Sequence, residues 1–172
     1  MSLKNKQILV LLAPEFEDLE FWVPTMRLIE EGAVVTVAGN HAKETYRGKT
    51  GILAITDIAF KDVQTAQYDA VLIPGGWAPD KLRRYAEVKR IVKEMYDANK
   101  IIGMICHAGL VGISAGIVKG HRATGSEGIK DDLINAGAEW EDAPAFRSGN
   151  IVWGRVVVDI PYYCKELVKA LE

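Results

Sequence analysis

Apolar and polar positions alternate in blocks along this chain, and the blocks predict strands and helices in turn. Four short apolar runs have the length and β-branched content of strands buried on both faces. They lie at 7–12, 34–38, 70–73 and 101–105. Apolar residues at helical spacing follow at 19–31, at 79–98 with a break near Tyr85, and at 109–116. Strands alternating with helices predict an α/β fold, with a mostly parallel sheet and helices on both faces.

The pattern changes in two places. After residue 39, a polar stretch leads to alternating Ile52 and Ala54, which predicts an antiparallel excursion from the main sheet. Residues 145–147 and 151–155 predict a hairpin around Ser148-Gly149-Asn150. A short strand end at 123–124 and helices at 129–136 and up to 171 complete the pattern. We expect Asp18 and Asp159 to be helix N-caps.

The run at 101–105 ends on Cys106, and a helix is expected to begin directly after it. Cys106 therefore falls at a strand-to-helix turn, the position of the reactive side chain in a nucleophile elbow. Unpaired amides and the positive end of the helix dipole favour a thiolate over a thiol there. We expect an acidic and reactive Cys106; the alternative is a small apolar filler of the core.

Three loops follow strands at the edge of the sheet where ligands bind in such folds: 14–18, 75–80 and 106–109. Glu17 can reach Cys106 if their strands are neighbours, and a protonated Glu17 could donate a hydrogen bond to the sulfur. Alternatively, Glu17 only decorates a helix N-terminus, the role that we assign to Glu15 and Glu20.

Two further positions carry chemistry. Gly75 and Gly76 let backbone amides approach a ligand, which suits an oxyanion hole, although an ordinary glycine turn has the same sequence. His107 could act as a general base if its ring swings back towards Cys106 or is held by a carboxylate. Asp80 is the nearest such carboxylate in sequence, and a purely structural His107 is the alternative.

Composition limits the class of protein. The 172 residues are 49% hydrophobic and 26% charged, with a formal net charge of −2, which fits one globular domain over 1–172. The balance gives no basic footprint for nucleic acid or for an anionic membrane, and no apolar run approaches a membrane span. The polar first six residues lack a signal region, and the two cysteines form no Cys-x-x-Cys pair. We therefore expect a cytoplasmic protein, with Cys164 packed on the last helix.

Several motifs are absent. Gly48-Lys49-Thr50 lacks the first P-loop glycine, since Lys43 stands there, and no Gly-x-Gly-x-x-Gly occurs. The three histidines have no metal-ligand spacing, so we expect neither a metal nor another cofactor. A glutamine amidotransferase is excluded because no histidine follows His121 to complete its triad.

Taken together, the motifs resemble the DJ-1/PfpI superfamily over nearly the whole chain, and in particular its PfpI-like subgroup of intracellular peptidases and deglycases. The motifs that carry the resemblance occur in the family's order. They are Glu15-Phe16-Glu17-Asp18, Pro74-Gly75-Gly76 with Ala78-Pro79-Asp80, Ile105-Cys106-His107, Ser114-Ala115-Gly116, and Gly128-Ile129-Lys130-Asp131-Asp132 through Asn135-Ala136-Gly137-Ala138.

The resemblance implies a flavodoxin-like three-layer sandwich with Cys106 as nucleophile and Glu17 as its carboxyl partner. It implies an oxyanion site from backbone amides near Gly76 and His107. It also implies that Asp80 of a neighbouring subunit orients the histidine, so that the active site lies at the interface of a homodimer or homohexamer.

The chain departs from the family at three places. Cys-His-Gly-Pro becomes Cys106-His107-Ala108-Gly109, and Thr-Ser becomes Thr124-Gly125. Ser-Arg-x-Pro-x-Asp-Leu becomes Gly154-Arg155-Val156-Val157-Val158-Asp159-Ile160, which changes one wall of the expected pocket.

The function expected from these residues and this resemblance is a cysteine-dependent hydrolase, in which Cys106 adds to a carbonyl held by backbone amides. Its substrates would be reactive carbonyl compounds or their early adducts on protein or nucleotide, a deglycase- or glyoxalase-like activity in the stress response. An intracellular cysteine peptidase acting on peptides is the first alternative. A redox sensor or stress chaperone without enzymatic activity is the second.

Overall fold

A computed structural model describes residues 2–172. Seven strands form its central sheet, in the order β10-β11-β7-β6-β1-β2-β5. Their bounds are β1 (Gln7–Leu11), β2 (Val34–Gly39), β5 (Ile58–Ala59), β6 (Ala70–Ile73), β7 (Ile101–Ile105), β10 (Ala145–Ser148) and β11 (Ile151–Gly154). Neighbouring strands are parallel except β10 and β11, which form the predicted antiparallel hairpin. The prediction of a mostly parallel sheet is confirmed.

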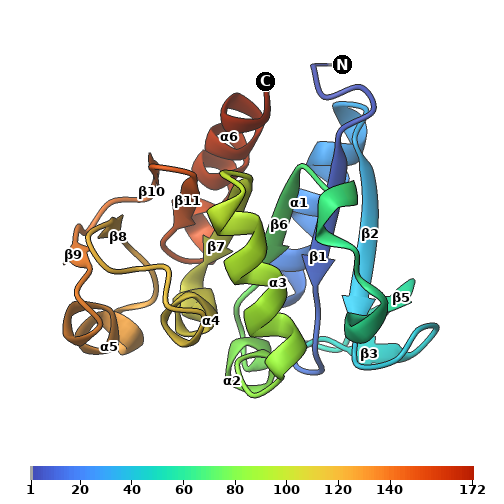
Figure 1. Ribbon diagram of the computed structural model, residues 1–172, viewed down its shortest axis with the longest axis horizontal. Coiled ribbons are helices and arrows are strands. Elements are labelled where there is room, and N and C mark those ends of the chain that lie inside the picture. Colours follow the sequence, from blue (N-terminus) through green and yellow to red (C-terminus); the bar gives the residue numbers. More distant parts are fainter. Residues whose placement is uncertain (1) are drawn as a thin grey trace.

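Helices cover both faces of this sheet (Figure 1). On one face, α1 (Asp18–Glu30) and α6 (Ile160–Leu171) contact each other. On the other face lie α2 (Ala78–Leu82), α3 (Ala86–Asp97) and α4 (Gly109–Ser114), so the predicted break near Tyr85 separates two helices. The short α5 (Lys130–Asn135) lies beyond α4, beside the last strands. The three layers agree with a flavodoxin-like sandwich.

Two small sheets flank the main one. β3 (Thr45–Arg47) and β4 (Leu53–Ile55) form an antiparallel hairpin, which confirms the predicted excursion. β8 (Arg122–Ala123) and β9 (Glu139–Trp140) form a parallel pair beside α5. The first sheet reaches the predicted loop at 14–18, where the Glu15 N–H donates to the Arg47 carbonyl at 2.8 Å. The segment after β8 reaches the loop at 106–109, where the Ser126 N–H donates to the Cys106 carbonyl at 3.0 Å.

The core follows the apolar runs. Every residue of β6 and β7 is buried, and α3 buries Val88, Ile91, Val92 and Met95, one face of a 3.6-residue period. The apolar residues of α1 do not all face the core, because Met26 is 59% exposed while Pro24 and Thr25 are buried. The apolar residues of α1 thus divide between the core and the surface.

Neither predicted N-cap makes a side-chain capping hydrogen bond. The Asp18 carboxylate instead accepts hydrogen bonds from the backbone N–H groups of Thr50 and Ile52, both at 2.8 Å. The Asp159 carboxylate accepts hydrogen bonds from the Arg155 guanidinium. Each aspartate therefore stabilises a neighbouring loop through its side chain and does not cap a helix. No helix within residues 2–172 has both the length and the apolar character needed to span a membrane.

Candidate active site

Cys106 lies at the carboxyl end of β7, where a 3₁₀ turn, Cys106–Ala108, runs into α4. Its φ is 61°, in the left-handed region that non-glycine residues seldom adopt. Such a conformation costs on the order of 1–3 kcal/mol and persists only where the surrounding structure imposes it. The turn is the nucleophile elbow that the sequence predicts, and it raises the thiol above the sheet edge.

Backbone hydrogen bonds join the loops at 14–18 and 75–80 beside this turn. The Glu17 N–H donates to the Gly75 carbonyl at 3.1 Å, and the Trp77 N–H donates to the Glu15 carbonyl at 2.9 Å. Gly76 has φ of 74°, and a Cβ there would lie 2.5 Å from Glu17 N. Only glycine fits this position, because the clash would be with backbone. Since β6 lies between β1 and β7, the loops after all three strands meet at Cys106.

The carboxyl group beside Cys106 belongs to Glu20, and the expectation that Glu17 is its carboxyl partner is wrong. Glu20 is 3% exposed, and its Oε2 accepts a hydrogen bond of 2.8 Å from the Gly75 N–H. A Cβ at Gly75 would lie 2.4 Å from Glu20 Oε2 and 3.2 Å from Cys106 Sγ, so both groups crowd the same point. Glu20 is thus no decoration of a helix end, and the Gly75 amide is already engaged.

Glu17 lines the same cavity as Cys106 but pairs with a cation there. Its carboxylate is 3.6 Å from the Lys49 ammonium, which comes from the turn between β3 and β4. Asp18 helps to position this lysine, because its carboxylate holds the backbone of the turn at Thr50 and Ile52.

The electrostatics couple the thiol to Glu20. Burial raises the pKa of Glu20 to about 7. Burial, followed by the charge of Glu20, raises the pKa of the Cys106 thiol to about 12, whereas the N–H groups of Gly76 and His107 lower it. The expectation of an acidic thiol is therefore wrong, because burial and the charge of Glu20 outweigh the two amides and raise the thiol pKa. Those two amides nevertheless point at the sulfur, where a developing negative charge would be stabilised.

His107 is a second base beside the thiol, with 3.2 Å between its Nδ1 and Cys106 Sγ. Burial, and then the charge of Lys49, lower the pKa of His107, so the ring is neutral at neutral pH. Asp80 lies on α2, and its carboxylate pairs with Arg84, just beyond the end of that helix. Among residues 2–172 of a single chain, no carboxylate hydrogen bonds to His107.

These groups open into a cavity of about 360 Å³, which we call the Cys106 cavity. It is lined by Glu17, Glu20, Lys49, Gly76, Trp77, Cys106, His107, Val156, Val157 and Val158. Within the described chain, no three His, Cys, Asp or Glu side chains are grouped so that they could hold a metal ion. The arrangement can place a carbonyl carbon on the sulfur, with its oxygen facing backbone amides.

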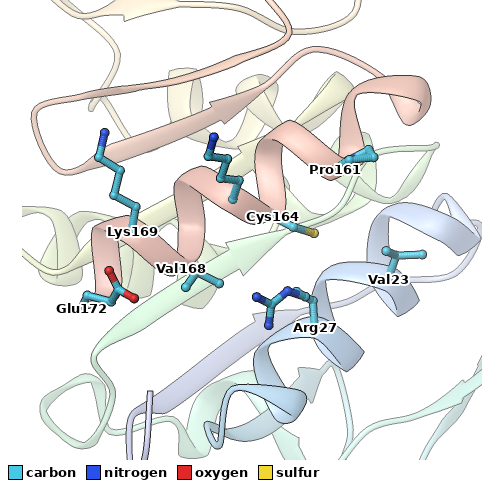
Figure 2. Close-up of a pocket in the computed structure, with 8 residues that line it drawn as sticks. Val23, Arg27, Pro161, Cys164, Val168, Lys169 and Glu172 are labelled. Atoms are coloured by element: carbon cyan, nitrogen blue, oxygen red, sulfur yellow. The ribbon is translucent and has the colours of Figure 1, made fainter. Parts of the chain in front are cut away.

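A larger cavity, of about 600 Å³, lies elsewhere, in the groove between α1 and α6 (Figure 2). It contains Cys164 and Arg27, which face each other across the groove. Burial raises the pKa of Cys164 to about 11. No histidine of the described chain lines this groove, and Cys164 lies within α6 instead of at a strand-to-helix turn. Both observations agree with the predicted packing role on the last helix.

Sequence reasoning missed Glu20, Lys49 and Trp77. Glu20 had a signal, because it stands four and eight residues before the buried Pro24 and Leu28 and so shares their face of the helix. A glutamate at a core position of an amphipathic helix is costly and suggests a function. Lys49 and Trp77 carried no such periodic signal.

The chain is also similar to known proteins over nearly its whole length. The model of the DJ-1/PfpI family matches residues 6–170. A deglycase of Pyrococcus abyssi is 40% identical over 166 residues, which cover 96% of this chain and 99% of the relative. The putative cysteine protease YraA of Bacillus subtilis is 36% identical over 168 residues, covering 98% of this chain and 99% of that protein.

Solved structures extend the likeness to the fold. A two-domain protein of Anabaena variabilis, with DJ-1/ThiJ/PfpI-like and ferritin-like domains, superposes with a TM-score of 0.95 at 33% identity. The match covers 97% of this chain and 48% of that one. Drosophila melanogaster DJ-1beta superposes with a TM-score of 0.91 at 24% identity, over 97% of this chain and 90% of its own.

Proposed function

Because the chain belongs to the DJ-1/PfpI family, we propose that it is a cysteine-dependent hydrolase of reactive carbonyl compounds or of their early adducts on proteins and nucleotides. The observation that carries the proposal is the strained Cys106 turn, with a buried carboxyl, a neutral imidazole and two backbone amides around one sulfur. Relatives named deglycases and a putative cysteine protease support hydrolysis as the general chemistry.

The proposed reaction begins when Cys106 Sγ bonds to the aldehyde carbon of a 2-oxoaldehyde while the thiol proton passes to Glu20. The carbonyl oxygen takes up a proton, which gives a hemithioacetal. His107 then removes the proton on that carbon and a proton returns to the neighbouring carbon, which converts the adduct to a 2-hydroxy thioester. Water cleaves the thioester to a 2-hydroxy acid and restores the thiol. The oxidation of one carbon balances the reduction of the next, so no outside oxidant is needed.

Glu20 suits the first proton transfer, because its Oε2 is held by the Gly75 N–H while its buried Oε1 has no hydrogen-bond partner among the described residues. A carboxyl group with a pKa of about 7 can accept and return a proton at neutral pH. Once Glu20 holds the proton, its charge no longer opposes the thiolate, and the Gly76 and His107 amides stabilise the sulfur.

We propose further that Asp80 of a second copy orients His107, in a homodimer or homohexamer whose active sites lie at an interface. The Asp80 side chain supports this role because it is 54% exposed and, among the described residues, pairs with Arg84 alone, just beyond the end of α2. A carboxylate on His107 would fix the ring orientation during proton transfer.

The test is methylglyoxal consumption and lactate formation by the purified protein, beside Cys106→Ala. We expect turnover by the wild type and none by Cys106→Ala. The matched control is Cys164→Ala, the other cysteine, which should retain activity. An inert wild type would overturn the carbonyl proposal. Peptide cleavage, or peroxide oxidation of Cys106 without turnover, would then identify a peptidase or a redox sensor.

Sharing of the site between copies is tested by mixing two inactive variants, Asp80→Ala and Cys106→Ala. Subunit exchange creates one site with both residues intact in each mixed dimer, so about a quarter of wild-type activity should return. Arg84→Ala is the control, since it removes the partner of Asp80 but leaves the carboxylate. No recovery, in a mixture shown by mass spectrometry to have exchanged subunits, would contradict a shared site.

A further inference from the structure

Two chemical kinds of residue line the Cys106 cavity. Glu17, Lys49 and His107 are charged or polar, and the Glu17 carboxylate lies 3.6 Å from the Lys49 ammonium. Trp77, Val156, Val157 and Val158 are apolar. A carbonyl carbon bound to the thiol would therefore meet polar groups for its oxygens and apolar groups for its substituent within one cavity.

Hydrogen bonds of Arg155 and Asp159 hold the loop that carries the three valines. Arg155 directs its guanidinium to Asp159 at 2.9 Å and to Asp142 at 2.7 Å, and its backbone N–H donates to the Pro144 carbonyl. The Asp159 N–H closes the segment onto the Val156 carbonyl at 2.9 Å. These hydrogen bonds fix the loop that carries the three valines, so their apolar surface is preorganised for binding.

Both apolar elements leave much of their surface uncovered. Val158 is 78% exposed and Trp77 is 59% exposed, although both line a concave site. The Trp77 ring centroid lies 6.4 Å from that of His107, with 36° between the ring planes, so the indole continues the surface beside the base. An apolar surface of this kind inside a pocket is typical of a binding site for an apolar group.

The volume points the same way. Ligand pockets for drug-sized molecules begin at roughly 300 Å³, and the Cys106 cavity holds about 360 Å³. Within a single chain, a three-carbon dicarbonyl would leave the Trp77 and valine surfaces of the cavity uncovered. A substrate with an aromatic ring would cover them.

Resting on the proposed function, we propose that the preferred substrates are 2-oxoaldehydes with an aromatic substituent, with Trp77 as the residue that determines this specificity. The ring packs between the indole and the three valines, while the two carbonyl oxygens face the amides and the polar groups of Glu17 and Lys49. Covering the ring and stacking it on the indole favours the aryl substrate by about ten- to a hundredfold in kcat/KM over the methyl compound.

The experiment compares phenylglyoxal with methylglyoxal as substrates of the wild type, Trp77→Ala and Val158→Ser. Met26→Ala is the matched control, because Met26 has the same exposed fraction as Trp77, 59%, but lies outside the Cys106 cavity. We expect the ratio of the two kcat/KM values to fall at least about fivefold in Trp77→Ala, to fall less in Val158→Ser, and to stay constant in Met26→Ala.

Two results would overturn the inference while leaving the proposed function intact. They are equal kcat/KM values for both substrates in the wild type, or a ratio that Trp77→Ala does not change. If neither compound is turned over, the proposed function fails, and the inference is then tested by the binding of mandelate and lactate to Cys106→Ser. Mandelate binding more tightly than lactate, with the difference lost on adding Trp77→Ala, would then still support the aromatic subsite. Equal binding would refute it.

Discussion

Replacing Glu20 with glutamine tests how the buried carboxyl controls Cys106. The variant keeps an oxygen for the Gly75 N–H but removes the charge that, after burial, does most to raise the thiol pKa to about 12. Two unit charges about 4 Å apart at an effective dielectric constant of about 20 interact by about 4 kcal/mol, or about three pKa units. Since burial remains, we expect the thiol pKa to fall by about 1–2 units.

The assay is the rate of iodoacetamide alkylation of Cys106 as a function of pH, in a Cys164→Ala background. The lower pKa should increase the rate at neutral pH about 10- to 100-fold, because the thiolate is the reactive form. Turnover of methylglyoxal should nevertheless fall about a hundredfold or more, because the thiol proton loses its acceptor. Glu17→Gln is the control and should change the alkylation profile little, since Glu17 faces Lys49. An unchanged midpoint in Glu20→Gln, or a larger shift in Glu17→Gln, would refute the reasoning.

The same residue makes stability depend on pH. The folded-state pKa of Glu20 is raised from 4.5 to about 7, so the folded protein binds more protons than the unfolded chain between these values. Its contribution to stability is therefore fully present below about pH 4.5 and is lost as the pH rises through about 7. For a side chain that is 3% exposed, the change across this window is about 3 kcal/mol. In Glu20→Gln this part of the pH dependence should be absent from urea unfolding curves.

Three further substitutions have expected outcomes. Asp18→Asn should destabilise the protein by about 2 kcal/mol in urea unfolding, because an amide replaces a carboxylate that binds two backbone N–H groups. Although burial opposes ionisation, those hydrogen bonds lower the Asp18 pKa, so the stability that Asp18 contributes should be present above its unfolded pKa and be lost as the pH falls through the lower folded pKa. A variant that is as sensitive to acid as the wild type would contradict this. Gly76→Ala should lower both the melting temperature and the alkylation rate of Cys106, since its Cβ meets backbone at 2.5 Å with φ of 74°; normal values for both would show that the two loops are not fastened there. Tyr163→Phe should stabilise the protein by about 1 kcal/mol in the same unfolding assay, because the buried hydroxyl has no partner among the described residues, whereas a loss of stability would reveal a bridging water.

The order of strands and helices was predictable because buried parallel strands and amphipathic helices have different periods. The elbow at Cys106 was predictable for the same reason, since it lies where one period gives way to the other. The carboxyl partner was missed although Glu20 shares the helix face of Pro24 and Leu28, because the packing of α1 decides that this face is buried. The helix register also decided that Met26 is exposed.

The protonation state was beyond a local reading of the sequence. A helix dipole favours a thiolate, but burial and the charge of Glu20 outweigh it and raise the thiol pKa. Both opposing effects depend on residues far from Cys106 in sequence. Asp18 shows the same limit, because its partners lie more than thirty residues away, on a hairpin whose position no local pattern reveals.

That hairpin has a consequence for how this protein can change. The β3–β4 excursion lies outside the central sheet, yet its turn brings Lys49 to the Cys106 cavity. The Asp18 carboxylate and the Phe16 carbonyl hold this turn through hydrogen bonds from its backbone N–H groups. Length changes in such surface segments cost little conformational entropy. Substrate range could therefore diverge by remodelling the hairpin tip, while the strained turn that holds the nucleophile is inherited unaltered. The chain thus places the nucleophile, Cys106, and the hairpin that can vary, β3–β4, on different elements.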